Sequence, residues 1–334
     1  MMRLGKISEN VLKRSVLKKI KNHREETVSG AGIGKDCAIL AFNSDHKSDY
    51  EIVTTTTSVT APVTELARYA ITMAVNNVAI AAAEPVGVML SLLLPENEEE
   101  TSLQTIMTQA EQVCEEQNIE ILGGHTEVTP VVNQAVLTVT ALGKKEAARA
   151  GYPQKIRANQ DIVVSKWIGL EGTVRLTKEY KDELCTRYPV RMIEEAEGFM
   201  QYLSVIPEAA TAIKSGVCGI HDVSRGGIFG ALWEMASGAG VGLEIDLKKL
   251  PIKQETVEIC EFFEVNPYEL LSGGCLIMVT PDGNGLVEKL ARENIPATVV
   301  GRTTEGNDRV IYNEEEKRFL DMPKTDQIYL VKEK

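Results

Sequence analysis

The sequence lacks any closely spaced pair of cysteines. Its six cysteines are scattered singly along the chain, at Cys37, Cys114, Cys185, Cys218, Cys260 and Cys275. Zinc sites and disulfide frameworks need cysteines at short, regular spacings. We therefore expect neither, and we expect most of these thiols to be buried.

Positive charge and long apolar runs are also scarce. The 334 residues carry a formal net charge of −12, which argues against general binding to nucleic acid or to an anionic membrane, because both need a basic surface. The first residues, MMRLGKISENVLKRSVLKKI, alternate charged and apolar positions without a continuous apolar run. They predict neither a signal peptide nor a membrane span, so we expect a cytoplasmic protein.

The composition itself is that of an ordinary globular protein. Hydrophobic residues make up 43% of the chain and charged residues 25%, and the length fits two domains of usual size. Strand-like runs such as YEIVTTTTSV alternate with helical patterns such as ELARYAITMAVNNVAIAAA, and the second half repeats the mixture after the polar stretch AARAGYPQKIRANQ. We predict two mixed α/β (α+β) domains, over residues 1–150 and 151–334.

One segment predicts a site for an anion. In HDVSRGGIFGALWEMA, a polar turn with glycines leads directly into a long helical pattern. The first N–H groups of a helix lack partners and the helix dipole favours negative charge, so a phosphate fits there. Gly226 and Gly227 would let it approach closely, and Ser224 would cap the helix. Arg225 would reach a phosphate oxygen, and Asp222 would bind a cation. The alternative is an ordinary capped helix after a loop.

Seven segments occur in an order that resembles the PurM-like (AIR synthase-related) ATP-binding superfamily. They are GIGKDCAIL, VTTTTSVTAPV, AVNNVAIAAAEPVG, ILGGHTEV, SKWIGLEGT, GIHDVSRGG and ELLSGGCLI, and they extend over nearly the whole chain. The IGLEGT and VNNVAIAAAEP segments and the length of both domains look most like HypE-type hydrogenase-maturation proteins.

This resemblance implies a fold, a ligand and a reaction. The N-terminal sheet would pair with that of a second subunit in a dimeric barrel, which makes the protein a homodimer. ATP would lie between the domains and across the dimer interface, with Mg²⁺ or another divalent cation bridging its phosphates to acidic side chains. The usual reaction transfers the γ-phosphate to an amide- or carboxyl-type oxygen, and a protein partner in metalloenzyme maturation is a further implication.

The chain departs from the superfamily pattern at usually acidic positions. Lys35 precedes Asp36 where relatives carry a second acid, and Thr56 ends TTT where they carry TTD. Asn77 ends VNN where they carry VND, and His125 follows two glycines where they carry an acid. Each neutral replacement is a weaker Mg²⁺ ligand than aspartate, yet all are polar. We therefore expect a modified nucleotide site, in which Lys35 replaces part of the missing cation charge.

The candidate site residues follow from these motifs. The predicted catalytic residues are Asp36, His125 and Asp222, and the predicted metal ligands are Asp36, Glu127 and Asp222. The predicted nucleotide and phosphate contacts are Lys35, Thr55, Thr56, Asn76, Asn77, Gly123, Gly124, Thr126, Lys166, Ser224, Arg225, Gly226 and Gly227.

Several of these residues have a plainer interpretation. His125, in a glycine-rich loop, is either a ligand for a softer metal or phosphate, or simply hydrogen-bonded. Asn76 and Asn77 either contact a ligand or satisfy backbone groups around a helix. His221 would only orient Asp222. The segment Ser272–Gly274 is either a tight turn or a backbone nest for phosphate.

Two classes of function remain open. The first is an ATP-using enzyme of the HypE type. The second is a non-catalytic or regulatory nucleotide-binding dimer that has lost hydrolysis of Mg-ATP, because the usual acids are replaced. HypE proteins carry a reactive cysteine at the end of a C-terminal tail, whereas this sequence ends DQIYLVKEK after a last cysteine at Cys275. We therefore expect any related reaction to use a substrate supplied from elsewhere.

Overall fold

The computed structural model describes residues 9–20, 25–35, 37–41, 49–61, 65–146, 155–322 and 324–331. These residues form two compact units. The N-terminal unit contains residues 25–31 and 37–146, and the C-terminal unit contains residues 9–20, 32–35 and 155–331. Within the described residues, no helix is long and apolar enough to cross a membrane.

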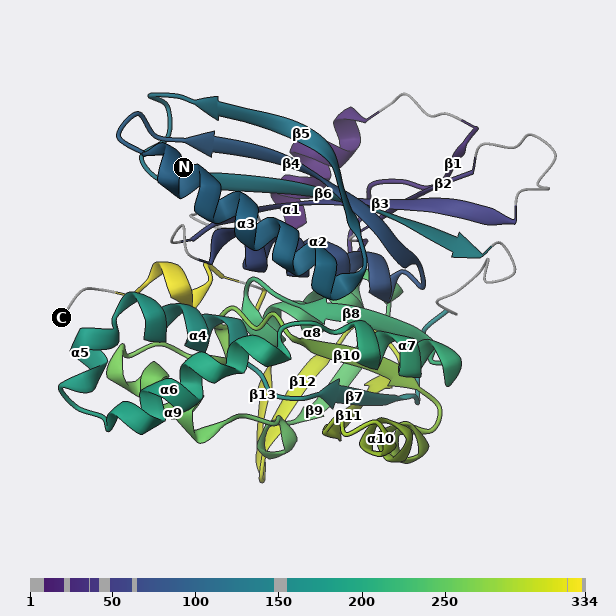
Figure 1. Cartoon of the computed structure of the whole chain (residues 1–334). Coiled ribbons are helices and arrows are strands. Elements are labelled where there is room, and N and C mark those ends of the chain that lie inside the picture. Colours follow the sequence, from purple (N-terminus) through teal and green to yellow (C-terminus); the bar gives the residue numbers. More distant parts are fainter. Residues whose placement is uncertain are drawn as a thin grey trace. The chain divides into compact units, whose positions relative to one another are not determined.

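The N-terminal unit is a six-stranded sheet with two helices (Figure 1). Its elements are β1 (Thr27–Ser29), β2 (Ala38–Leu40), β3 (Tyr50–Thr60), α2 (Leu66–Ile80), β4 (Glu84–Leu94), α3 (Glu100–Gln117), β5 (Glu120–Val128) and β6 (Val136–Glu146). The strand order is β1-β2-β3-β6-β4-β5, and only β4 and β5 run parallel, joined by α3 as a crossover. The β-branched run of β3 explains why this segment is a strand.

Helix α2 covers one face of this sheet. It contacts β3, β4 and β6, and it also packs against α3. Val53, Leu90 and Val139 are buried toward this side, and their sequence neighbours point to the opposite face. Helix α3 packs beside α2, so the two described helices of this unit lie on the same side of the sheet, and the opposite face is called the open face below.

The C-terminal unit is built on a seven-stranded sheet of order β13-β12-β9-β11-β7-β10-β8. Its strands are β7 (Asp161–Ser165), β8 (Gly219–Val223), β9 (Gly242–Asp246), β10 (Cys275–Thr280), β11 (Ala297–Thr304), β12 (Arg309–Asn313) and β13 (Glu316–Phe319). Its helices are α1 (Glu9–Val11), α4 (Leu170–Glu179), α5 (Lys181–Cys185), α6 (Val190–Glu197), α7 (Ile206–Lys214), α8 (Gly227–Ala239), α9 (Gln254–Phe262) and α10 (Gly283–Arg292). Short helical turns η1 (Leu12–Val16), η2 (Leu17–Lys19), η4 (Gly198–Tyr202), η5 (Leu247–Lys249), η6 (Pro267–Glu269) and η7 (Gln327–Tyr329) connect them.

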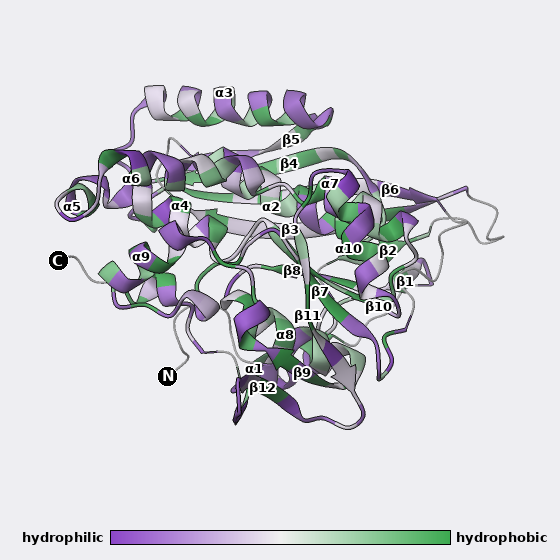
Figure 2. Cartoon of the chain, turned by 90° about the horizontal axis from the view of Figure 1, so that it is seen from below, coloured by the Kyte–Doolittle hydropathy of each residue, from purple (hydrophilic) through white to green (hydrophobic). Residues whose placement is uncertain are grey.

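Two hydrophobic cores hold the C-terminal unit together. The first lies between α8 and the sheet, where Ile228 and Leu232 pack with Ile162 and Ile277; the central strands β7 and β10 are correspondingly hydrophobic in Figure 2. The second joins α4, α5, α6 and α9 as a helical layer. The sheet thus supplies the rigid base on which the N-terminus of α8 is placed.

The segment RMIEEAEGFMQYLSVIPEAATAIKSG, residues 191–216, has helical periodicity but is not one helix. It divides into α6, η4 and α7, and Pro207 stands in the first turn of α7. Proline lacks the N–H that a helix interior needs but fits its first turn. The periodicity predicted the helical state, and the proline decides where the last helix begins.

Candidate functional site

The open face of the N-terminal sheet carries several of the predicted residues. On this face the Oγ1 atoms of Thr56 and Thr140 lie 3.0 Å apart, and the Oγ of Ser58 lies 2.8 Å from the Oγ1 of Thr138. The register β3–β6–β4–β5 puts Gly123 in the same row as Thr56 and Thr140. Strand alternation then puts residues 125 and 127 on the same face. The fold therefore brings Thr56, Gly123, His125 and Glu127 onto one polar surface.

His125 lies in strand β5, not in a glycine-rich loop as predicted. The ILGGHTEV segment pairs along its length with β4, and this pairing overrides the weak strand propensity of two glycines. The Nε2 atom of His125 is 3.3 Å from an Oε2 atom of Glu127, and the two side chains are 66% and 54% exposed. This contact is the hydrogen-bonded arrangement given as the plainer interpretation.

Gly124 serves the packing of two strands. A Cβ atom at Gly124 would lie 1.8 Å from the carbonyl oxygen of Leu90, whereas a Cβ at Gly123 would meet nothing within 4 Å. Gly124 therefore permits the close approach of β4 and β5. At Gly123, by contrast, the missing side chain leaves the backbone exposed on the polar surface.

The remaining predicted residues of this unit lie on the helix side or at its edge. Thr55 and Asn76 are buried, and Asn76 is inside α2 together with Asn77, so neither asparagine caps the helix. The Asn77 carbonyl accepts a hydrogen bond from the Cys37 thiol at 3.1 Å. Thr126 alternates with His125 and points to the opposite face. Asp36 lies outside the described residues.

The N-terminus of α8 is occupied by the chain's own carboxylate. Oδ2 of Asp326 accepts a hydrogen bond from the Gly226 N–H at 2.6 Å. Oδ1 accepts from the N–H groups of Leu271 and Ile328 at 3.2 and 2.9 Å. An internal carboxylate thus lies at the helix start where the sequence predicts a phosphate, and the phosphate site stays a prediction.

Two details of the predicted phosphate cradle are different in the structure. Ser224 makes no side-chain cap; Gly226, with φ of +84°, is the N-cap. A Cβ at Gly227 would lie 2.5 Å from the Tyr268 carbonyl oxygen and 2.8 Å from that of Leu270. Gly227 is therefore required by close packing, because the loop before β10 lies directly against the helix start.

A second buried carboxylate lies near Asp326. Glu171, on α4, is 3% exposed, and its Oε1 atom is 3.9 Å from an N–H nitrogen of Arg175. Burial raises the pKa of Glu171, and the charges of Arg175 and Arg225 oppose that rise. Burial also raises the pKa of Asp326, against the effect of its backbone donors and Arg225. Arg225, predicted to reach phosphate, therefore lies in the field of two internal carboxylates.

Lys166 is engaged inside the C-terminal unit. Its Nζ atom forms an ion pair with Glu208 and donates to the carbonyl oxygens of Tyr202 and Ser204, each at 2.7 Å. Both charged side chains are buried. All three N–H groups of the ammonium are used, so a phosphate contact by Lys166 would require this ion pair to open. We leave Lys166 out of the site proposed below.

His221 and Asp222 are neighbours on β8 but do not act as a pair. Alternation along a strand turns them to opposite faces, and Nε2 of His221 lies 3.6 Å from an Oε2 atom of Glu234 on α8. His221 thus contacts α8 and does not orient Asp222 as predicted. Lys35 is exposed, and the loop that contains it, Gly32–Lys35, packs near Glu234 and Gly238.

The segment Ser272–Gly274 is a turn. The Ser272 hydroxyl accepts from the Gly169 N–H at 2.8 Å and donates to the Leu270 carbonyl at 2.7 Å. Among the residues that the structure describes, no three His, Cys, Asp or Glu side chains form a metal-binding group. The exposed pair of His125 and Glu127 offers one imidazole and one carboxylate, a donor set that does not fit Mg²⁺, which prefers several oxygens.

Sequence reasoning missed Asp326, Glu171 and Glu208. Asp326 forms a local turn by accepting from the N–H two residues ahead, a pattern that an aspartate in TDQI could suggest. Its hydrogen bonds to the N–H groups of Gly226 and Leu271 join positions far apart in the chain, so local sequence patterns do not predict them.

Two family models match the chain in sequence order. The N-terminal domain model of AIR synthase related protein matches residues 34–144, and the C-terminal domain model matches residues 157–313. With the two sheets described above, these matches define a protein of the PurM-like class, with two mixed α/β domains. The chain belongs to the AIR synthase related protein family.

The chain is HypE-like among characterised proteins. A protein of Methanocaldococcus jannaschii, provisionally named as a hydrogenase expression/formation protein, is 25% identical and the match covers 97% of this chain and 96% of that protein. The carbamoyl dehydratase HypE of Rhodobacter capsulatus is 25% identical over 81% of this chain and 77% of its own length.

Solved structures confirm the predicted fold class. A HypE–HypF complex matches with a TM-score of 0.74 at 19% identity, over 93% of this chain and 99% of that chain. AaThiL complexed with AMPPCP and TMP matches with 0.71 at 21%, over 96% and 98%. A HypE structure in complex with ATP matches with 0.67 at 16%, over 98% of both chains. The dimeric barrel stays a prediction.

Proposed function

We propose that this chain is a nucleotide-binding protein that uses ATP to activate an amide- or carboxyl-type oxygen, together with a protein partner in metalloenzyme maturation. Relatives with this fold are solved with ATP or AMPPCP, one relative is solved as a HypE–HypF complex, and another is named a carbamoyl dehydratase. In the transfer, the substrate oxygen bonds to the γ-phosphorus, the bond from that phosphorus to the β–γ bridging oxygen breaks, and ADP leaves.

The observation that carries this proposal is the polar surface of the N-terminal sheet. In the pair of Thr56 and Thr140, one hydroxyl donates to the other, so the acceptor's own hydrogen can bind a ligand oxygen. Ser58 and Thr138 add a second hydroxyl pair on the same face. His125 adds an imidazole at the same face. The hydroxyl donors suit phosphate oxygens but bring no positive charge. The identity of the divalent cation stays a prediction.

A second candidate is a regulatory nucleotide-binding homologue. It is favoured by the donor set, because the described part of the chain brings no carboxylate cluster to the polar surface. Binding without transfer would need only the hydroxyl donors and the backbone of Gly123.

ATP turnover separates the two candidates. We expect the purified protein to bind ATP by calorimetry and to release phosphate with Mg²⁺ or Mn²⁺. A Thr56→Asp/Asn77→Asp/His125→Asp variant restores three acids at the usual positions, and we expect it to raise the Mg²⁺-dependent rate by at least about tenfold. Thr108→Asp, at an exposed position of α3 in the same unit, is the control for added negative charge.

Each result decides between the candidates. Turnover by the unmodified protein supports the enzyme. Binding without turnover, with a gain in the triple variant alone, supports the regulatory protein. If ATP does not bind, both candidates are wrong.

We also propose that the protein is a homodimer through the N-terminal sheet. Eight of the nine residues of the edge strand β5 are exposed, and the apolar Leu122 and Val128 are 48% and 59% exposed. An uncovered edge with apolar side chains favours pairing with a second chain.

This proposal predicts that one substitution changes the assembly. We expect Leu122→Glu to shift sedimentation from dimer to monomer, because it places a charge in the apolar contact. Val131→Glu is the matched control, since Val131 is 81% exposed in the turn after β5. A monomeric unmodified protein at micromolar concentration would contradict the proposal.

A further inference from the structure

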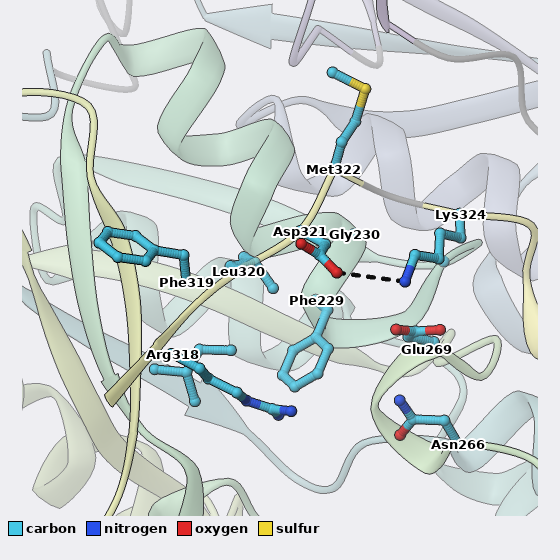
Figure 3. Close-up of a pocket in the computed structure, with 12 residues that line it drawn as sticks. Phe229, Gly230, Asn266, Glu269, Arg318, Phe319, Leu320, Asp321, Met322 and Lys324 are labelled. Atoms are coloured by element: carbon cyan, nitrogen blue, oxygen red, sulfur yellow. Dashed lines mark hydrogen bonds and ion pairs between the residues drawn. The ribbon is translucent and has the colours of Figure 1, made fainter. Parts of the chain in front are cut away.

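The C-terminal unit contains a hollow, drawn in Figure 3. Of the residues predicted as nucleotide contacts, Gly226 alone is among its lining residues. It is open to solvent and lies between the start of α8 and residues 318–322 and 324; its empty space, open solvent included, is about 500 Å³. All of its lining residues belong to this one unit. The shape of the hollow is therefore set by the C-terminal unit alone.

The aromatic ring of Phe229 lines one side of the hollow, and Tyr268 packs on that ring. The rings of Phe229 and Tyr268 are stacked with centroids 5.1 Å apart and planes inclined by 11°. Leu320 and Met322 add apolar surface from the opposite segment. Such a wall favours an apolar, planar ligand body, because burial of its surface removes it from water.

Arg318 provides the charge of the hollow. Its Cζ atom lies 5.4 Å from the centroid of the Phe229 ring. In a contact with a ring face, a guanidinium keeps its N–H groups in its own plane, so they stay available to an acceptor in the hollow. Among the described residues, no carboxylate forms an ion pair with Arg318.

The other charged groups of the hollow are already engaged. Nζ of Lys324 lies 3.3 Å from Oδ2 of Asp321. Oε2 of Glu269 accepts from Nε2 of Gln327 at 2.9 Å. Glu269 keeps its negative charge, because the Gln327 amide is neutral. Arg318 is the cation of the hollow that no described carboxylate pairs, and its fork of donors matches a carboxylate or a phosphate.

We propose that this hollow binds a small aromatic anion, with the ring against Phe229 and the anionic group on Arg318. This proposal does not rest on the proposed nucleotide site. Two ligands with the same ring system, one a carboxylate and one a phosphate, show which anionic group the hollow binds more tightly.

Fluorescence titration of the full chain tests this proposal with 2-naphthoate, 2-naphthyl phosphate and the neutral 2-naphthylmethanol. We expect saturable binding of at least one anion, tighter than that of the alcohol. Arg318→Gln should weaken anion binding by roughly five- to tenfold and leave the alcohol unchanged. Phe229→Leu should weaken all ligands that bind.

Lys317→Gln is the matched control, because Lys317 precedes Arg318 on β13 and does not line the hollow. It should leave all affinities unchanged. The proposal is overturned if neither anion binds up to millimolar concentration, or if Arg318→Gln has no effect. Displacement of the naphthyl anion by ATP, lost in Arg318→Gln, would also overturn it, because the hollow would then belong to the nucleotide site.

Discussion

We expect the Asp326→Ala variant to lose about 3 kcal/mol of unfolding free energy. The substitution removes the acceptor of the N–H groups of Gly226, Leu271 and Ile328. Each buried N–H left without a partner costs roughly 1–3 kcal/mol. Urea unfolding followed by tryptophan fluorescence measures the loss, because both tryptophans, Trp167 and Trp233, lie in the C-terminal unit.

A graded series of substitutions tests the origin of this loss. Asp326→Asn keeps an oxygen for Leu271 and Ile328 but turns an amide N–H toward the Gly226 N–H, so its loss should be intermediate. Asp321→Ala, in the same segment but exposed, should leave the unfolding midpoint unchanged. Equal losses for Asp326→Ala and Asp321→Ala would show that the bonds of Asp326 contribute nothing.

The effect of Asp326 should also depend on pH. Burial raises the pKa of Asp326 above its ordinary value of 3.8 in the folded state. Between that value and the raised pKa, the folded state holds more protons than the unfolded chain, so this group's contribution to stability falls as pH rises. The free-energy difference between the unmodified protein and Asp326→Ala should therefore be larger below pH 3.8 than at neutral pH. An increase with pH would contradict the direction of this pKa shift.

The sequence predicted the elements whose pattern is local. The segments YEIVTTTTSV and ELARYAITMAVNNVAIAAA form β3 and α2. Their β-branched run and helical periodicity are local patterns, so they predict these elements without knowledge of tertiary contacts. The fold class follows from the same alternation, and the two family matches confirm it. Strand β5 was not predicted, because only pairing with β4 makes a strand of a segment with two glycines.

In the candidate site, too, local features were predicted from the sequence and contacts between distant residues were not. The start of α8 was predicted correctly from GGIFGALWEMA, whereas the phosphate site there stays a prediction. The Asp326 carboxylate that accepts from the Gly226 N–H was not predicted, because Asp326 lies 100 residues from Gly226 in the chain. The contacts of Lys166 escaped prediction for the same reason, since Lys166 follows β7 and Glu208 reaches it from α7.

We expect the Lys166→Met variant to lose about 4 kcal/mol of unfolding free energy, because it leaves the buried Glu208 carboxylate without its cation. Burial lowers the pKa of Lys166 and raises the pKa of Glu208, and the ion pair opposes both shifts. Without the lysine, Glu208 should take up a proton on folding. Urea unfolding followed by tryptophan fluorescence measures the loss.

A double variant separates the ion pair from simple packing. Lys166→Met/Glu208→Leu removes both charges, and we expect it to recover roughly 2 kcal/mol relative to Lys166→Met. Recovery should be incomplete, because the carbonyl oxygens of Tyr202 and Ser204 still lack their donor. Arg191→Met, which breaks an exposed ion pair with Glu195 on α6, is the control and should cause no measurable change. A double variant as unstable as Lys166→Met would assign the loss to packing and to the two carbonyls, and would leave the ion pair without a role in stability.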